Sequence, residues 1–70
     1  MAVVELKVGV HCQDCAKAIK KAIKKLEEIE TYKVERELNK VTVTGNVTVE
    51  EVARALRRIG KHASDWNAEN

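Results

Sequence analysis

Residues 41–51 read Val-Thr-Val-Thr-Gly-Asn-Val-Thr-Val-Glu-Glu and decide most of the fold. Apolar and polar residues alternate over residues 41–44, which is typical of a half-buried strand, and Gly45 is expected to end it. Thr48 followed three positions later by Glu51 has the pattern of a capping box at the start of a helix. This stretch therefore predicts a strand that is followed closely by a helix.

The predicted helix after Thr48 carries one apolar stripe, and Gly60 is placed to end it, because glycine commonly follows the last helical turn. Residues 61–66 are then expected to form a short last strand, and residues 67–70 a frayed tail. The stripe consists of Val52, Ala55, Leu56 and Ile59.

The first half of the chain has the same order of patterns. Residues 3–8 alternate and predict a strand, and helical spacing of apolar residues begins at Cys15, with lysines on the opposite face. This helix is expected to fade over residues 28–30. Alternation returns over residues 31–38, and the Asn-Lys pair at 39–40 suits a tight turn. The apolar positions of the helix are Ala18, Ile19, Ala22, Ile23 and Leu26.

The predicted order is β-α-β-β-α-β, with two similar halves that meet at the turn. Right-handed crossovers then give a four-stranded antiparallel sheet with both helices on one face. The predicted class is therefore α+β, a ferredoxin-like sandwich. We expect residues 1–70 to form a single domain with its core over residues 3–66. Because many functions share this fold, the function must be argued from a site.

Composition limits the classes of function. The net charge is +2, from 13 basic and 11 acidic residues, which is too even to indicate nucleic-acid binding. One Tyr, one Trp and no Phe leave few aromatic faces for stacking on RNA bases. No catalytic motif is recognisable, so an enzyme is not expected. Without a signal peptide or a long apolar stretch, the sequence predicts a cytoplasmic protein with no membrane partner.

Cys12 and Cys15 form a C-x-x-C motif at the junction between a loop and the first helix. Backbone N–H groups and the helix dipole favour the thiolate there, and thiolates prefer soft metals. Two thiolates in one exposed loop suit copper(I). Zinc(II) prefers four ligands, and only His11 and His62 could add to the cysteines, without the paired histidines of a finger. Zinc(II) or cadmium(II) could still bind in vitro, and two molecules could pool four thiolates in a metal-bridged homodimer.

A C-x-x-C motif is also the signature of thiol–disulfide exchange. The chain has no proline and no aromatic residue beside the motif, and it is short for a thioredoxin-like architecture, which disfavours this alternative. A structural disulfide would close a very short loop and stabilise little, and a reducing compartment opposes it.

Residues 6–15, Leu-Lys-Val-Gly-Val-His-Cys-Gln-Asp-Cys, resemble the metal-binding loop of heavy-metal-associated domains. Residues 40–47 and 60–63 and Trp66 extend the resemblance, which is greatest to plant copper chaperones of the antioxidant type and their isoprenylated relatives. It implies that Cys12 and Cys15 bind copper(I) and transfer it to related domains of copper-transporting P-type ATPases.

The resemblance also implies roles for two residues beside the cysteines. Lys61 matches a lysine near the metal loop, where an ammonium would offset the negative charge of copper(I) held by two thiolates. An ordinary solvated lysine is the alternative. Val10 stands where the family usually has a methionine beneath the loop, and it leaves a smaller apolar plug.

Several alternatives stay open from the sequence. The chain could be a metal-binding domain excised from an ATPase, or a protein-interaction module that serves as an effector target or regulatory domain. It ends without a prenylation motif, so either the lipid-tailed form does not apply or this is an excised domain. The lysines of the first helix could dock an acidic partner or simply form its solvated face.

Overall fold

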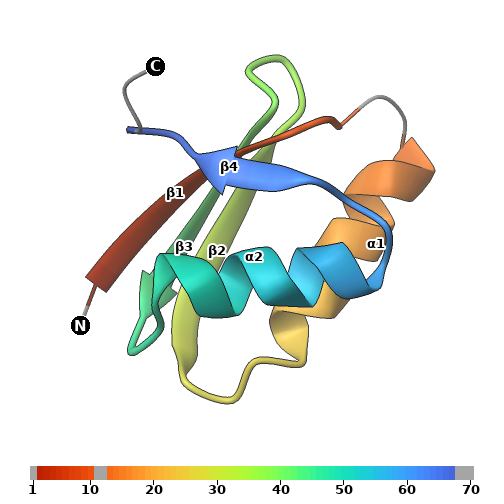
Figure 1. The fold of residues 1–70 in the computed structure, drawn as a ribbon. Coiled ribbons are helices and arrows are strands. Elements are labelled where there is room, and N and C mark those ends of the chain that lie inside the picture. The colour runs from red at the N-terminus through yellow and green to blue at the C-terminus, as the bar shows by residue number, and fades with distance from the viewer. Residues whose placement is uncertain (1, 11–12, 68–70) are drawn as a thin grey trace.

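A computed structural model describes residues 2–10 and 13–67 of the chain. Its elements follow the predicted order, and the four strands form one antiparallel sheet in the order β2-β3-β1-β4 (Figure 1). The prediction of a ferredoxin-like α+β fold is therefore confirmed. The elements are β1 (Ala2–Val8), α1 (Gln13–Lys24), β2 (Ile29–Glu35), β3 (Lys40–Gly45), α2 (Val49–Arg58) and β4 (Ala63–Asp65).

The core lies between the two helices and one face of the sheet. Alternate residues of the central strands β1 and β3 point into it, as the period-2 pattern predicted. Helices α1 and α2 cover these side chains with aliphatic residues at helical spacing. The fully buried side chains are Leu6, Val8, Ile19, Ile23, Val41, Val43, Val52 and Leu56. No described helix is long and apolar enough to span a membrane.

Helix α1 differs from its predicted bounds at both ends. It begins at Gln13, before the predicted Cys15, and ends at Lys24, well before residues 28–30. The last turn tightens, because the amide of Leu26 donates to the carbonyl of Ile23 at 3.0 Å, and the chain then turns towards β2. Leu26 therefore packs against the core from outside the helix.

The hairpin between β2 and β3 also differs from the prediction. Strand β2 covers Ile29–Glu35 rather than residues 31–38, and residues 36–39 form a four-residue turn. The predicted turn at 39–40 is wrong because Lys40 already pairs with Lys7 in the sheet. The amide of Asn39 donates to the Arg36 carbonyl at 3.3 Å, and Asn39 has a φ of 51°.

Both predicted ends of helix α2 are confirmed. The amide of Thr48 donates to Glu51 Oε1 at 3.1 Å, and the amide of Glu51 donates to Thr48 Oγ1 at 3.2 Å, which completes the capping box. At the other end Gly60 has a φ of 81°, and the amide of Lys61 donates to the carbonyl of Leu56 at 3.0 Å, as in a Schellman motif.

Two further predictions near the C-terminus need correction. Ile59 is the C-cap residue and 37% exposed, so it is not part of the buried stripe. Strand β4 covers only Ala63–Asp65, although the Trp66 amide still donates to the Glu5 carbonyl at 2.9 Å. Asn67 is held by a bond from its Nδ2 to Glu5 Oε1 at 3.2 Å, so it is not frayed. Residues 68–70 lie outside the described residues.

Candidate metal centre

Cys15 lies in the first turn of α1 and is half-buried. It sits at the end of the helix where backbone N–H groups are not used by the helix itself, so its sulfur is near the positive end of the helix dipole. The other predicted ligand, Cys12, and the neighbouring His11 lie outside the described residues. The described part of the centre is therefore built around the sulfur of Cys15.

Lys61 reaches this sulfur from the end of α2. Its Nζ donates to Cys15 Sγ at 3.0 Å, and the two residues are 46 positions apart in the sequence. The Schellman motif explains the placement, because the turn at Gly60 directs the chain back past the start of α1 (Figure 1). An ammonium in charge-assisted contact with sulfur stabilises negative charge on it.

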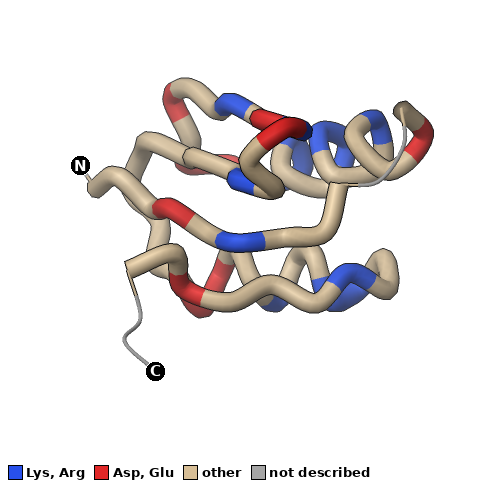
Figure 2. The backbone as a smooth tube through the Cα atoms, turned by 90° about the horizontal axis from the view of Figure 1, so that it is seen from above, with Lys and Arg blue, Asp and Glu red and all other residues tan. Residues whose placement is uncertain are grey.

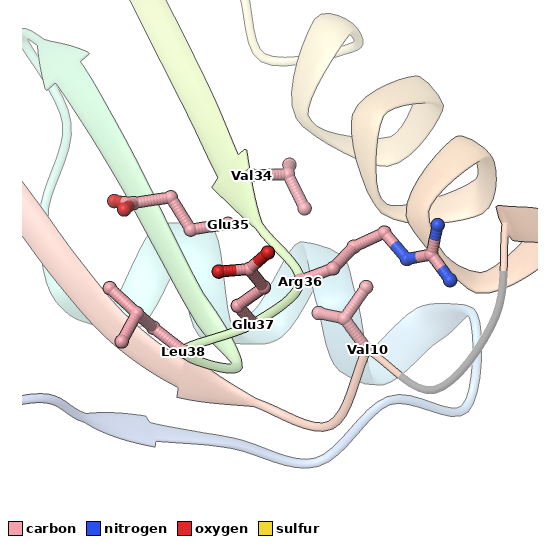
Figure 3. A pocket seen from close by; sticks show the side chains of 6 residues that line it. All are labelled: Val10, Val34, Glu35, Arg36, Glu37 and Leu38. Atoms are coloured by element: carbon pink, nitrogen blue, oxygen red, sulfur yellow. The ribbon is translucent and has the colours of Figure 1, made fainter.

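Val10 is the last described residue before the C-x-x-C motif. It is 4% exposed and belongs to the core cluster, so it fills an apolar position there. Beside it opens a groove of about 780 Å³, with Val10 on one side and the β2–β3 hairpin on the other (Figure 3). The residues that line the groove are Val10, Val34, Glu35, Arg36, Glu37 and Leu38.

Asn39 holds the same segment of the loop and was not identified from the sequence. Its backbone carbonyl accepts a hydrogen bond from the amide of Val8 at 2.9 Å, and its side-chain Oδ1 accepts one from the amide of Val10 at 3.1 Å. The second bond joins residues 29 positions apart. Only the pairing of β1 with β3 brings these residues together, so no local pattern could have indicated the contact.

His62, the other described candidate for a zinc site, is exposed between α2 and β4. Over residues 2–10 and 13–67, no three His, Cys, Asp or Glu side chains come close enough to hold a metal ion. Basic residues are concentrated on the two helices, as Figure 2 shows. The exposed ones on and directly after α1 are Lys17, Lys20, Lys21, Lys24 and Lys25, and those on α2 are Arg54, Arg57 and Arg58.

The sequence model of the heavy-metal-associated domain family matches residues 5–62 of the chain. The chain belongs to this family. Heavy metal-associated isoprenylated plant protein 33 of Arabidopsis thaliana is 44% identical over 63 residues, which are 90% of this chain and 11% of that protein. Copper transport protein CCH of the same plant is 39% identical over 66 residues, 94% of this chain and 54% of that protein. The chain thus spans about a tenth to a half of the length of these relatives.

Solved structures of heavy-metal-associated domains have the same fold. The N-terminal domain of PacS from Synechocystis is 26% identical with a TM-score of 0.87, and covers 96% of this chain and all (100%) of that one. The copper(I)-loaded first domain of the human copper chaperone for SOD1 is 25% identical with a TM-score of 0.84. The match covers 91% of this chain and 90% of that domain. The chain is therefore a heavy-metal-associated domain related to copper chaperones and copper transport proteins.

Proposed function

We propose that the domain over residues 3–66 is a cytoplasmic copper(I) chaperone module that binds one ion through Cys12 and Cys15. The observation that carries the proposal is the 3.0 Å contact between Lys61 Nζ and Cys15 Sγ at the start of α1. A lysine ammonium and a helix N-terminus both stabilise a thiolate, which is the form of cysteine that binds metal. Their combination on one sulfur supports a metal site over a structural cysteine.

The choice of copper(I) follows from the chemistry of the donors. Soft thiolate ligands select soft ions, and copper(I) accepts two sulfur ligands without an enclosed cage. The complex of copper(I) with two thiolates is an anion, so the ammonium of Lys61 also offsets the charge of the loaded site. Zinc(II) prefers four ligands, so in this domain it is a weaker competitor unless two chains share one ion.

Transfer proceeds by ligand exchange. A thiolate of the receiving protein forms a copper–sulfur bond while a bond to Cys12 or Cys15 breaks, so copper stays monovalent and is never released as a free ion. The partner we propose is a heavy-metal-associated domain of a copper-transporting P-type ATPase. The exposed lysines of α1 would favour an acidic surface on that partner, because opposite charges speed encounter.

An anaerobic titration tests the proposal. Reduced protein is titrated with copper(I) in the presence of a coloured copper(I) chelator, and sulfur coordination is read by X-ray absorption. We expect one copper(I) per chain with two sulfur ligands. Zinc(II) under the same conditions is the control and should bind more weakly. A reduced protein that leaves all the copper with a weak chelator would show that the proposed function is wrong.

The role of Lys61 is tested by the Lys61→Leu variant. It keeps an apolar side chain at this position, removes the charge at Cys15 Sγ, and adds no thioether that could itself bind copper(I). For a half-exposed charged contact worth about 1 kcal/mol, copper(I) should bind roughly fivefold more weakly. Lys61→Arg should recover part of the affinity, and Lys33→Leu in β2 is the matched control. Equal affinity of Lys61→Leu and the wild type would contradict the role.

A further inference from the structure

We propose that Asn39 is a positioning residue for the chain segment that leads into the C-x-x-C motif. This inference rests on the proposed function. It starts from the two hydrogen bonds that Asn39 accepts, from the amide of Val8 at 2.9 Å and from the amide of Val10 at 3.1 Å. Together they fix the chain on both sides of Gly9, where β1 has ended and the loop begins.

The residue type suits both tasks. Asn39 has a φ of 51°, in the left-handed region that asparagine tolerates better than most residues. This backbone conformation closes the turn through the bond from the Asn39 amide to the Arg36 carbonyl at 3.3 Å. The side-chain oxygen remains available to accept the amide of Val10. An alanine at position 39 would lose the side-chain acceptor and would have a strained backbone at this φ. A glycine would lose only the acceptor.

The hairpin that carries Asn39 is itself held firmly to the sheet. The next residue, Lys40, forms an ion pair with Glu5 at 2.8 Å, and its Nζ lies 4.8 Å from the centre of the Trp66 ring. This ion pair holds the pKa of the Glu5 carboxyl below its usual value. Because the contacts of Lys40 with Glu5 and Trp66 hold the end of the hairpin, the neighbouring Asn39 Oδ1 is held in a defined position.

The consequence for the metal site follows from chain geometry. Cys15 is carried by α1, and the segment that holds Cys12 runs from Val10 to Gln13, the first residue of this helix. Val10 is therefore one of the two described ends between which this segment is connected. A fixed Val10 lowers the entropy cost of bringing the two sulfurs onto one ion.

The test uses Asn39→Gly, which keeps the backbone conformation and the bond from Val8 but removes the acceptor for Val10. In the metal-free protein, the Val10 amide should exchange with solvent deuterium faster than in the wild type, while the amides of β3 are unchanged. Copper(I) affinity should fall about threefold to tenfold, as expected for the loss of one hydrogen bond. Asn39→Asp restores an acceptor and should recover the protection of Val10 and most of the affinity.

Asn46→Gly is the matched control, because Asn46 follows the other end of β3 and its Nδ2 bonds Glu28 Oε2 at 3.2 Å. It introduces the same flexibility far from the loop and should leave copper(I) affinity unchanged. A wild type that binds no copper(I) overturns the proposed function and this inference with it. A wild type that binds copper(I), with Asn39→Gly binding equally well or with Val10 exchange unaltered, overturns the inference alone.

Discussion

The Cys15→Ser variant is expected to lose tight copper(I) binding while α1 and the sheet stay folded. A serine hydroxyl remains protonated at neutral pH and is a hard donor, so the ion would keep only one thiolate. The loss should exceed the roughly 100-fold effect of removing a supporting residue around a metal site. Cys15 is only half-buried, so the substitution should cost little stability.

The same anaerobic chelator titration measures this effect, with circular dichroism and thermal unfolding of the metal-free variant as the check on folding. Cys12→Ser should behave in the same way, because we assign the two sulfurs equal parts in holding the ion. Ala18→Ser, one turn further along α1, controls for a new hydroxyl on this helix. If both cysteine variants bound copper(I) as tightly as the wild type, the assignment of the ligands would be wrong.

Gly45→Ala is expected to cause a large loss of stability, although it adds only one methyl group. A Cβ at this position would lie 2.5 Å from the Glu28 carbonyl oxygen and 2.6 Å from Ile29 Cα. Both are backbone atoms, at the irregular start of the pairing between β2 and β3. Relieving the clash means moving a strand, so we expect a loss of about 2–4 kcal/mol.

For a chain of this size the total free energy of unfolding is on the order of 5 kcal/mol, so Gly45→Ala should keep only about 1–3 kcal/mol and melt well below the wild type. Urea unfolding followed by circular dichroism measures the change. Gly60→Ala is the matched control, because Gly60 also has a positive φ but nothing lies within 4 Å of its added Cβ. It should cost only about 1–2 kcal/mol. Equal losses in the two variants would contradict the argument from the clash.

The parts of the fold that were predictable are those determined by neighbouring residues. Thr48 and Glu51 form their capping box within one helical turn, and Gly60 ends α2 through its own backbone freedom. The alternation in β1 and β3 reflects burial on one face, so it too can be read locally. The order of the elements followed from these signals.

The end of β2 could not be predicted in the same way. Arg36 interrupts the apolar face that Tyr32 and Val34 begin, but Leu38 looks like a further apolar strand position, yet Leu38 lies in the turn and is 53% exposed. The turn at residues 36–39 is stabilised by the bond from the Asn39 amide to Arg36 and by contacts with β1. Those contacts depend on the register of the sheet, which sequence periodicity does not contain.

The residue types of the candidate site were predictable, but the contacts that hold the neighbouring backbone in place were not. The C-x-x-C motif indicated soft-metal chemistry, and family resemblance suggested a lysine near it. The structure brings Lys61 onto the sulfur of Cys15. Asn39 had no local signal, because its contact with Val10 depends on the pairing that sets Lys7 opposite Lys40. Cys12 and His11 lie outside the described residues.

Lys61 and Cys15 are 46 positions apart in the sequence, so their contact forms only in the folded chain and links metal binding to folding. The two cysteines are close in sequence, so an unfolded chain still offers both thiols to copper(I), but it has neither the helix end nor the ammonium. A ligand stabilises the native state only by the difference between its affinities for the folded and the unfolded chain. The rise in melting temperature on adding copper(I) therefore measures what the fold adds to the dithiol, rather than the strength of the dithiol itself.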